Sequence, residues 1–166
     1  MFGAALCTLN LNGKNGLTAL LVGAPAFSDF NRPNEYDIGV VYLYVAQNKR
    51  MKLNTTIKGK QNGGYFGFSI INLGDMDGDN NDEIAIAAPY ENEGSGVIYI
   101  YTSTGILTAK HSQKLVGEPW FPNFGYSITI VKDIDDNGCN ELAVSSPKNN
   151  KIVMLKSIPS ITVTIR

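Results

Sequence analysis

Hydrophobic residues along the chain fall in short runs separated by polar segments rich in glycine, asparagine and proline. The runs contain many β-branched and aromatic residues, as in FSIINL, EIAIAA, GVIYIY and QKLV. Runs of this length and composition are typical of β-strands. Continuously apolar segments such as 84–87 and 142–144 predict inner strands that are covered on both faces. No stretch combines a helical period with capping residues, so we expect an essentially all-β chain.

The same pattern occurs three times along the chain. Each copy opens on Phe-Gly and passes through a short apolar run to a proline. The glycines at 3, 67 and 125 are spaced by 64 and 58 residues, and the prolines at 25, 89 and 147 have the same two spacings. Matching spacings at two landmarks indicate stacked supersecondary units rather than chance.

Each unit contains four predicted strands, and four-stranded units repeated radially predict a β-propeller. Propellers usually close with four to eight blades, so three units predict a partial ring. We expect a partial β-propeller over 1–157, with repeats at about 2–59, 66–117 and 124–156, and an exit segment at 158–166 that leads towards a following domain. Asn-Gly pairs at 12–13, 15–16 and 137–138 predict tight hairpin turns.

The overall charge excludes some classes of partner. The chain of 166 residues has 14 basic and 15 acidic residues, so no basic excess points to nucleic acid or to an anionic membrane surface. No apolar run approaches the ~18 residues of a membrane span, and the N-terminus lacks the features of a signal peptide. We therefore expect any membrane connection to come from other parts of a longer protein. Two cysteines, Cys7 and Cys139, are too few for a disulfide framework.

Acidic residues are concentrated in two short loops, 75–83 and 133–141, which hold nine of the 15. In both loops the polar side chains fall at positions 1, 3, 5 and 9. Alternating residues of a tight turn direct oxygens to one centre, and hard oxygen ligands in this number suit Ca²⁺. Backbone carbonyls at position 7 would add one ligand each. The predicted ligands of two Ca²⁺ ions are Asp75, Asp77, Asp79, Asn81 and Glu83, and Asp133, Asp135, Asn137, Cys139 and Glu141. Asp82, at position 8, is expected to point away.

Electrostatics favour a cation in these loops over a solvated acidic turn. Two carboxylates about 4 Å apart repel by roughly 1 kcal/mol in water and roughly 4 kcal/mol at a partly buried surface. Mg²⁺ fits less well because it demands compact octahedral geometry. A helix-loop-helix calcium site is excluded because position 12 is Ile86 in one loop and Val144 in the other. The first copy has no carboxylate in 10–19 and carries Lys14, so we expect no Ca²⁺ there.

The order of Phe-Gly, Asp-x-Asp-x-Asp/Asn with an acid at position 9, and Gly-Ala-Pro or a variant resembles the FG-GAP repeat of integrin α-subunit propellers. The resemblance covers nearly the whole chain, at Phe2-Gly3 with 23–25, Phe66-Gly67 with 87–89 and Phe124-Gly125 with 145–147. It implies the last three blades of a seven-bladed ring of the integrin α N-terminal domain type, with Ca²⁺ on the lower face. The family usually has aspartate at position 9, where this chain has glutamate.

By this resemblance the chain is part of a cell-surface adhesion receptor on the extracellular side of the plasma membrane. The implied partners are an integrin β subunit and an extracellular matrix or cell-surface protein ligand, bound mainly through the upper face. The loops 26–37 and 117–123 are expected to project there, with Trp120 packed between blades. The sequon at Asn54 suits a secreted surface.

A second reading is an FG-GAP propeller of a secreted enzyme, such as a phospholipase D, or of a lectin. The residues give it no direct support, because the single histidine, His111, lies in a polar stretch without a nucleophile or metal-ligand partner at useful spacing. We therefore expect a surface histidine and a chain that is not an enzyme.

Overall fold

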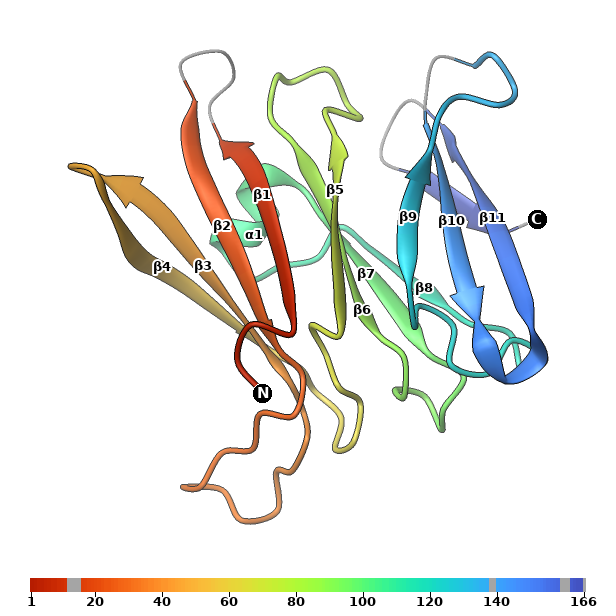
Figure 1. Ribbon diagram of the computed structural model, residues 1–166, viewed down its shortest axis with the longest axis horizontal. Coiled ribbons are helices and arrows are strands. Elements are labelled where there is room, and N and C mark those ends of the chain that lie inside the picture. The colour runs from red at the N-terminus through yellow and green to blue at the C-terminus, as the bar shows by residue number, and fades with distance from the viewer. Residues whose placement is uncertain (12–15, 138–139, 159–161, 166) are drawn as a thin grey trace.

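A computed structural model describes residues 1–11, 16–137, 140–158 and 162–165. The chain forms three four-stranded antiparallel sheets that stand side by side (Figure 1). The predicted all-β architecture of three propeller-like blades is confirmed. The Asn-Gly turns at 12–13, 15–16 and 137–138 lie wholly or partly outside the described residues.

Each sheet follows the order of its strands along the chain, so hairpins connect neighbours throughout. The first sheet contains β1 (Ala5–Leu11), β2 (Leu17–Ala24), β3 (Val40–Gln47) and β4 (Arg50–Lys58). The second contains β5 (Ser69–Gly74), β6 (Glu83–Ala88), β7 (Val97–Tyr101) and β8 (Gln113–Val116). The third contains β9 (Ile128–Val131), β10 (Glu141–Ser146), β11 (Lys151–Ile158) and β12 (Thr162–Ile165). The runs EIAIAA and QKLV form strands with the predicted bounds.

The third sheet extends further than the predicted repeat. Residues 158–166 were expected to leave the propeller, but β12 pairs antiparallel with β11, with Leu155 opposite Ile165 and Ile158 opposite Thr162. All four residues of the stretch Thr-Val-Thr-Ile are β-branched, a composition that favours strands. The structure therefore places 162–165 at the outer edge of the third sheet instead of in a segment that leads away.

Two short helical turns interrupt the β pattern. Helix α1 (Ser103–Leu107) connects β7 to β8, and a 3₁₀ turn, η2 (Pro147–Asn149), connects β10 to β11. The Thr102 side chain caps α1 by accepting a hydrogen bond from the Gly105 N–H. Five residues are too few to show a helical period, which is why the sequence pattern did not predict this helix.

The hydrophobic core consists of two layers, one on each face of the second sheet. Alternate residues of β6 point in opposite directions, so Ile84 and Ile86 pack against the first sheet while Ala85 and Ala87 pack against the third. All four are fully buried. This confirms that the continuously apolar runs belong to strands covered on both faces. The first strand of the second sheet, β5, lies between β1 and β9 (Figure 1), and within each sheet the fourth strand is at the edge opposite the first.

The Phe-Gly motifs join each blade to the one before it. The Phe66 and Phe124 side chains are buried, and their backbones lie against Gly39 and Gly96 at the starts of β3 and β7. A Cβ on Gly96 would lie 2.2 Å from the Phe124 carbonyl oxygen. Phe2 is exposed, and its ring lies 5.5 Å from that of Tyr42 within the first sheet. The motif thus works as an inter-blade contact in the second and third copies.

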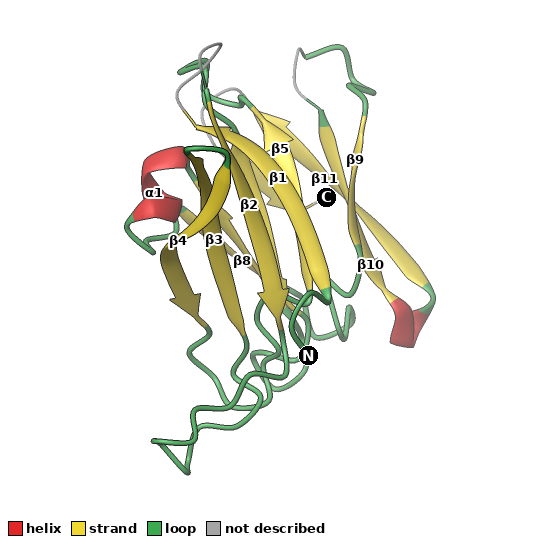
Figure 2. Cartoon of the chain, turned by 60° about the vertical axis from the view of Figure 1, so that its left-hand side comes forward, coloured by secondary structure: helices red, strands yellow, loops and turns green. Residues whose placement is uncertain are grey.

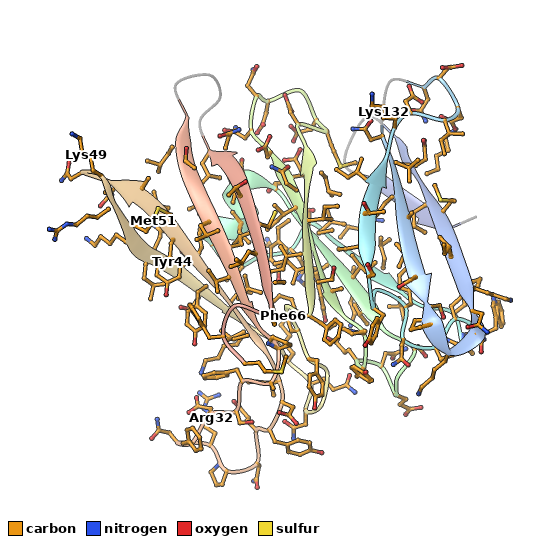
Figure 3. The ribbon with its side chains drawn as sticks, viewed as in Figure 1. Arg32, Tyr44, Lys49, Met51, Phe66 and Lys132 are labelled. Carbon is orange, nitrogen blue, oxygen red and sulfur yellow. The ribbon has the colours of Figure 1, made fainter. Side chains whose placement is uncertain are left out.

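The loops divide between two ends of the molecule. The loops from the first to the second strand of the second and third sheets lie at one end, and the long loop from β2 to β3 lies at the other (Figures 1 and 2). Figure 3 shows Lys132 at the first end and Arg32 at the second.

Trp120 was expected to pack between blades, but its side chain is 58% exposed. This expectation was wrong because Phe124, not Trp120, fills the inter-blade position.

Candidate metal centre

Two β-hairpins carry the acidic loops. The first loop connects β5 to β6, and the second connects β9 to β10 (Figure 1). Glu83 and Glu141 are the first residues of β6 and β10, so the strand ladder fixes their backbones opposite Gly74 and Val131. The remaining acids lie on the loops themselves. Each centre therefore combines one glutamate held by a sheet with aspartates held by a tight turn.

Three carboxylates converge in each loop. One oxygen from each of Asp75, Asp77 and Glu83 lies within 4.8 Å of the other two. The equivalent residues of the third blade meet the same condition. They are Asp133, Asp135 and Glu141. The sequence register that aligned the two loops thus corresponds to the same cluster in space.

Backbone amides shape the first loop around its aspartates. Asp75 accepts hydrogen bonds from the N–H groups of Gly78 at 2.7 Å and Asn80 at 2.9 Å. Asp77 accepts one from Asp79 at 3.1 Å. These side-chain to backbone bonds are typical of acids in turns. They hold the loop curled, with its carboxylates gathered on one side.

Each loop contains an equivalent hydrogen bond that orients its glutamate. Glu83 Oε2 accepts from the Met76 N–H at 2.8 Å, and Glu141 Oε2 accepts from the Ile134 N–H at 2.7 Å. In both loops, the side chain at position 9 is therefore hydrogen-bonded to the backbone at position 2. Only one oxygen of each glutamate is used in this way.

The second oxygen of each glutamate is buried without a partner among the described residues. Glu83 is fully buried and Glu141 is 6% exposed, yet neither Oε1 accepts a hydrogen bond from residues 1–11, 16–137, 140–158 or 162–165. Burial, and to a smaller extent the nearby charges of Asp77, Asp79 and Asp75, raise the pKa of Glu83 to about 7, while the hydrogen bond from Met76 lowers it. Burying a carboxylate without a compensating partner is costly. A cation beside Oε1 would remove that cost, so the donor set fits a metal ion.

Residues at positions 5 and 7 lie outside the two groups of converging carboxylates. Asp79 Oδ1 accepts a hydrogen bond from the Asn81 N–H at 2.8 Å. Asn137 donates its backbone N–H to Asp133 at 3.0 Å, and Cys139 lies outside the described residues. Asp79, Asn81, Asn137 and Cys139 therefore remain predicted ligands that the geometry of the carboxylates does not test.

Asp82 points away from the cluster, as predicted, and binds the neighbouring blade. Its Oδ2 accepts hydrogen bonds from the Asn10 N–H and from the Asn72 side-chain amide, both at 2.8 Å. The Asn72 amide also donates to the Thr8 carbonyl at 3.0 Å. The far side of the first acidic loop is thus attached to β1.

The third-blade loop differs in having a basic neighbour. Lys156 on β11 forms an ion pair with Asp135, and both side chains are partly exposed. No ion pair among the described residues places a basic group on Asp75, Asp77 or Glu83. A cation in the third-blade loop would compete with the Lys156 ammonium for Asp135.

The first blade lacks the buried acid. Counting back six residues from the proline of each copy gives Ala19, Glu83 and Glu141, and all three positions are buried. An alanine side chain offers no oxygen donor, and Ala19 instead packs in the hydrophobic core. Lys14 and most of the loop lie outside the described residues.

A second feature, at the opposite end, was missed in the sequence. The rings of Tyr65, Phe68, Tyr90 and Tyr126 form a chain of contacts, with centroids 4.8 to 6.3 Å apart. Tyr90 and Tyr126 remain 37% and 41% exposed. An available signal was the aromatic residue that directly follows Phe-Gly in the second and third copies. We call these four residues the aromatic patch.

His111 is less exposed than the sequence suggested. Its ring meets Tyr99 edge to face, with centroids 5.0 Å apart, and lies near Tyr101. Burial lowers the pKa of His111, and Lys60 and Lys114 lower it further. The histidine is part of an aromatic contact and not a solvated surface group.

Comparisons with known proteins agree with this architecture. The FG-GAP repeat family matches residues 66–101, which include the first acidic loop. Integrin alpha-4 of Xenopus laevis is 36% identical over 98% of this chain, and integrin alpha-6 of Homo sapiens is 34% identical over 98%. Integrin alpha-PS2 of Drosophila melanogaster is 33% identical over 95%.

The chain spans only a small part of these relatives, between 12% and 16% of their lengths. No helix among the residues that the structure describes is long and apolar enough to cross a lipid bilayer. The matches extend over all three sheets and both acidic hairpins. Residues 66–101 therefore match the FG-GAP repeat, and the chain is homologous, over almost its whole length, to part of the integrin α subunits.

Proposed function

We propose that each acidic hairpin binds one Ca²⁺ and that the two ions stabilise the propeller of an adhesion-receptor α subunit. The observation that carries the proposal is a pair of buried glutamate oxygens, Glu83 Oε1 and Glu141 Oε1, which have no hydrogen-bond partner in the part of the chain that the structure describes. One oxygen of each glutamate lies within 4.8 Å of oxygens from two aspartates. Without a cation, like charges in a buried place repel, whereas a divalent ion would make binding energy part of folding energy.

The donor chemistry favours calcium among the common metals. All side-chain donors in the two groups are carboxylate oxygens, which suit hard cations and not Zn²⁺ or Cu²⁺. Ca²⁺ accepts six to eight oxygens in flexible geometry, so water and backbone carbonyls can complete its shell. The loop residues Asp79, Asn81, Asn137 and Cys139 are the proposed additional ligands.

The end opposite the acidic loops is the proposed binding face. Exposed aromatic groups are enriched at protein interfaces, and the aromatic patch offers several in contact with one another. We infer that this face meets an integrin β subunit and an extracellular matrix or cell-surface ligand, with the protein on the outer side of the plasma membrane. The homology to integrin α subunits supports this assignment over a secreted enzyme or a lectin.

Calcium binding is tested by calorimetric titration of the chain and of Asp77→Ala, Asp135→Ala and the double variant. We expect two sites in the parent, one in each single variant and none in the double variant. Glu93→Gln, which removes an exposed charge outside both loops, is the matched control and should keep both sites. A double variant that binds as much Ca²⁺ as the parent would refute the site assignment.

The binding face is tested in an α subunit that contains this segment, co-expressed with a β subunit. Replacing Tyr90 and Tyr126 by alanine should reduce heterodimer recovery. Met51→Ala, which truncates an exposed apolar side chain on β4, should leave recovery unchanged. Equal recovery for all variants would remove the aromatic patch from the interface while leaving the calcium proposal intact.

A further inference from the structure

The chain contains one Asn-X-Ser/Thr sequence, Asn54-Thr55-Thr56, and the structure places it on β4. This strand is the edge of the first sheet, and among the described strands it pairs with β3 alone. The register shifts at this point, because Leu43 lies opposite Thr55 and Tyr44 lies opposite Leu53. Asn54 is therefore the extra residue of a β-bulge.

The bulge leaves the acceptor amide free. Asn54 is exposed, and its Nδ2 donates no hydrogen bond to any described residue, while Oδ1 lies 2.8 Å from the Thr55 hydroxyl. Thr56 is also exposed. Thr55 is the half-buried member, and its hydroxyl lies 3.1 Å from the Leu107 carbonyl of α1. The middle residue thus contacts the second blade, and the two residues that define the acceptor face solvent.

The surroundings of Asn54 show what a glycan would do there. Met51 and Leu53 on the same edge strand are 46% and 47% exposed. An exposed edge with apolar side chains is a template for pairing with another chain, and proteins usually block such edges. A bulky, hydrophilic group on Asn54 would cover this edge.

We propose that Asn54 is an N-glycosylation site and that its glycan shields the outer edge of β4. Nδ2 attacks the anomeric carbon of a polyprenyl-diphosphate-linked oligosaccharide, and a carbon–nitrogen bond forms. The bond from that carbon to the diphosphate oxygen breaks, so the polyprenyl diphosphate leaves and the amide loses one proton. The proposal rests on the extracellular location given under the proposed function, because the oligosaccharide donor is met in the secretory pathway.

The test is expression of the chain behind a heterologous secretion leader in animal cells. We expect the secreted chain to carry one glycan on the peptide containing Asn54, and glycosidase treatment to remove it with conversion of Asn54 to aspartate. Asn54→Gln and Thr56→Ala should lose the glycan, and Thr56→Ser should keep it. Secreted wild-type chain with an unmodified Asn54 would overturn the proposal.

The shielding role has its own readout. Enzymatic removal of the glycan from the folded protein should increase self-association in sedimentation experiments, and Leu53→Thr should reverse that increase. No change on deglycosylation would overturn the shielding role. Because the leader supplies entry to the secretory pathway, a missing glycan refutes this inference alone, whereas missing Ca²⁺ binding refutes the proposed function alone.

Discussion

Replacing Glu83 by glutamine should have opposite effects on stability with and without calcium. The variant keeps the size of the side chain and the acceptor for the Met76 N–H, and it removes one buried negative charge. In calcium-free protein this charge lowers the free energy of unfolding, because it is fully buried beside two aspartates. With calcium bound, the same charge becomes a favourable contact.

The size of the calcium-free effect follows from the pKa of Glu83. Burial raises it from 4.5 to about 7, which corresponds to about 3 kcal/mol. A carboxyl with a raised pKa in the folded state stabilises the fold fully below pH 4.5, and this contribution is lost as the pH rises through about 7. At pH 8 without calcium, Glu83→Gln should therefore be more stable than the parent by up to about 3 kcal/mol. Near pH 4 the two should be alike.

The assay is urea unfolding at several pH values, in calcium or in a chelator. Saturating calcium should reverse the order at pH 8, because the parent gains binding energy that the variant largely lacks. Glu93→Gln serves as the control and should follow the parent under both conditions. If the variant is no more stable than the parent in chelator at pH 8, the buried charge is not a cost. If it is also more stable in calcium, Glu83 is not a ligand.

The remaining predictions concern the loop neighbours and the blade contacts. Asp82→Ala should cost about 1.5–3 kcal/mol in urea unfolding, because it removes hydrogen bonds from a charged group to Asn10 and Asn72, and should leave Ca²⁺ stoichiometry unchanged. A loss of one Ca²⁺ site would instead make Asp82 a ligand. Lys156→Ala should tighten Ca²⁺ binding in the third blade by up to about fivefold in calorimetry, since a partly exposed ion pair is worth at most about 1 kcal/mol. Unchanged or weaker binding would show that Lys156 does not compete. Gly96→Ala should lower the melting temperature far more than Gly94→Ala, because both have positive φ but only Gly96 would clash with Phe124. Equal losses would rule out the close approach.

Much of the fold could be predicted from local patterns. The runs that form β6 and β8 have the predicted bounds, because apolar β-branched residues end at acids, glycines and prolines that stop strands. The repeated spacing gave the number of blades. Helix α1 and strand β12 were not predicted, since one is too short to show a period and the other depends on pairing with β11.

The sequence by itself determined the three repeats, their strands and the positions of two acidic hairpins. These features depend on residues close together along the chain, whose turn chemistry and alternation act locally. Only the tertiary structure decided that Glu83 and Glu141 are each buried with one oxygen that no described residue contacts by a hydrogen bond, and that Asp82 binds Asn10 across 72 positions of sequence. Burial and inter-blade hydrogen bonds are set by how the sheets stack, and that stacking brings together residues with no fixed separation along the chain.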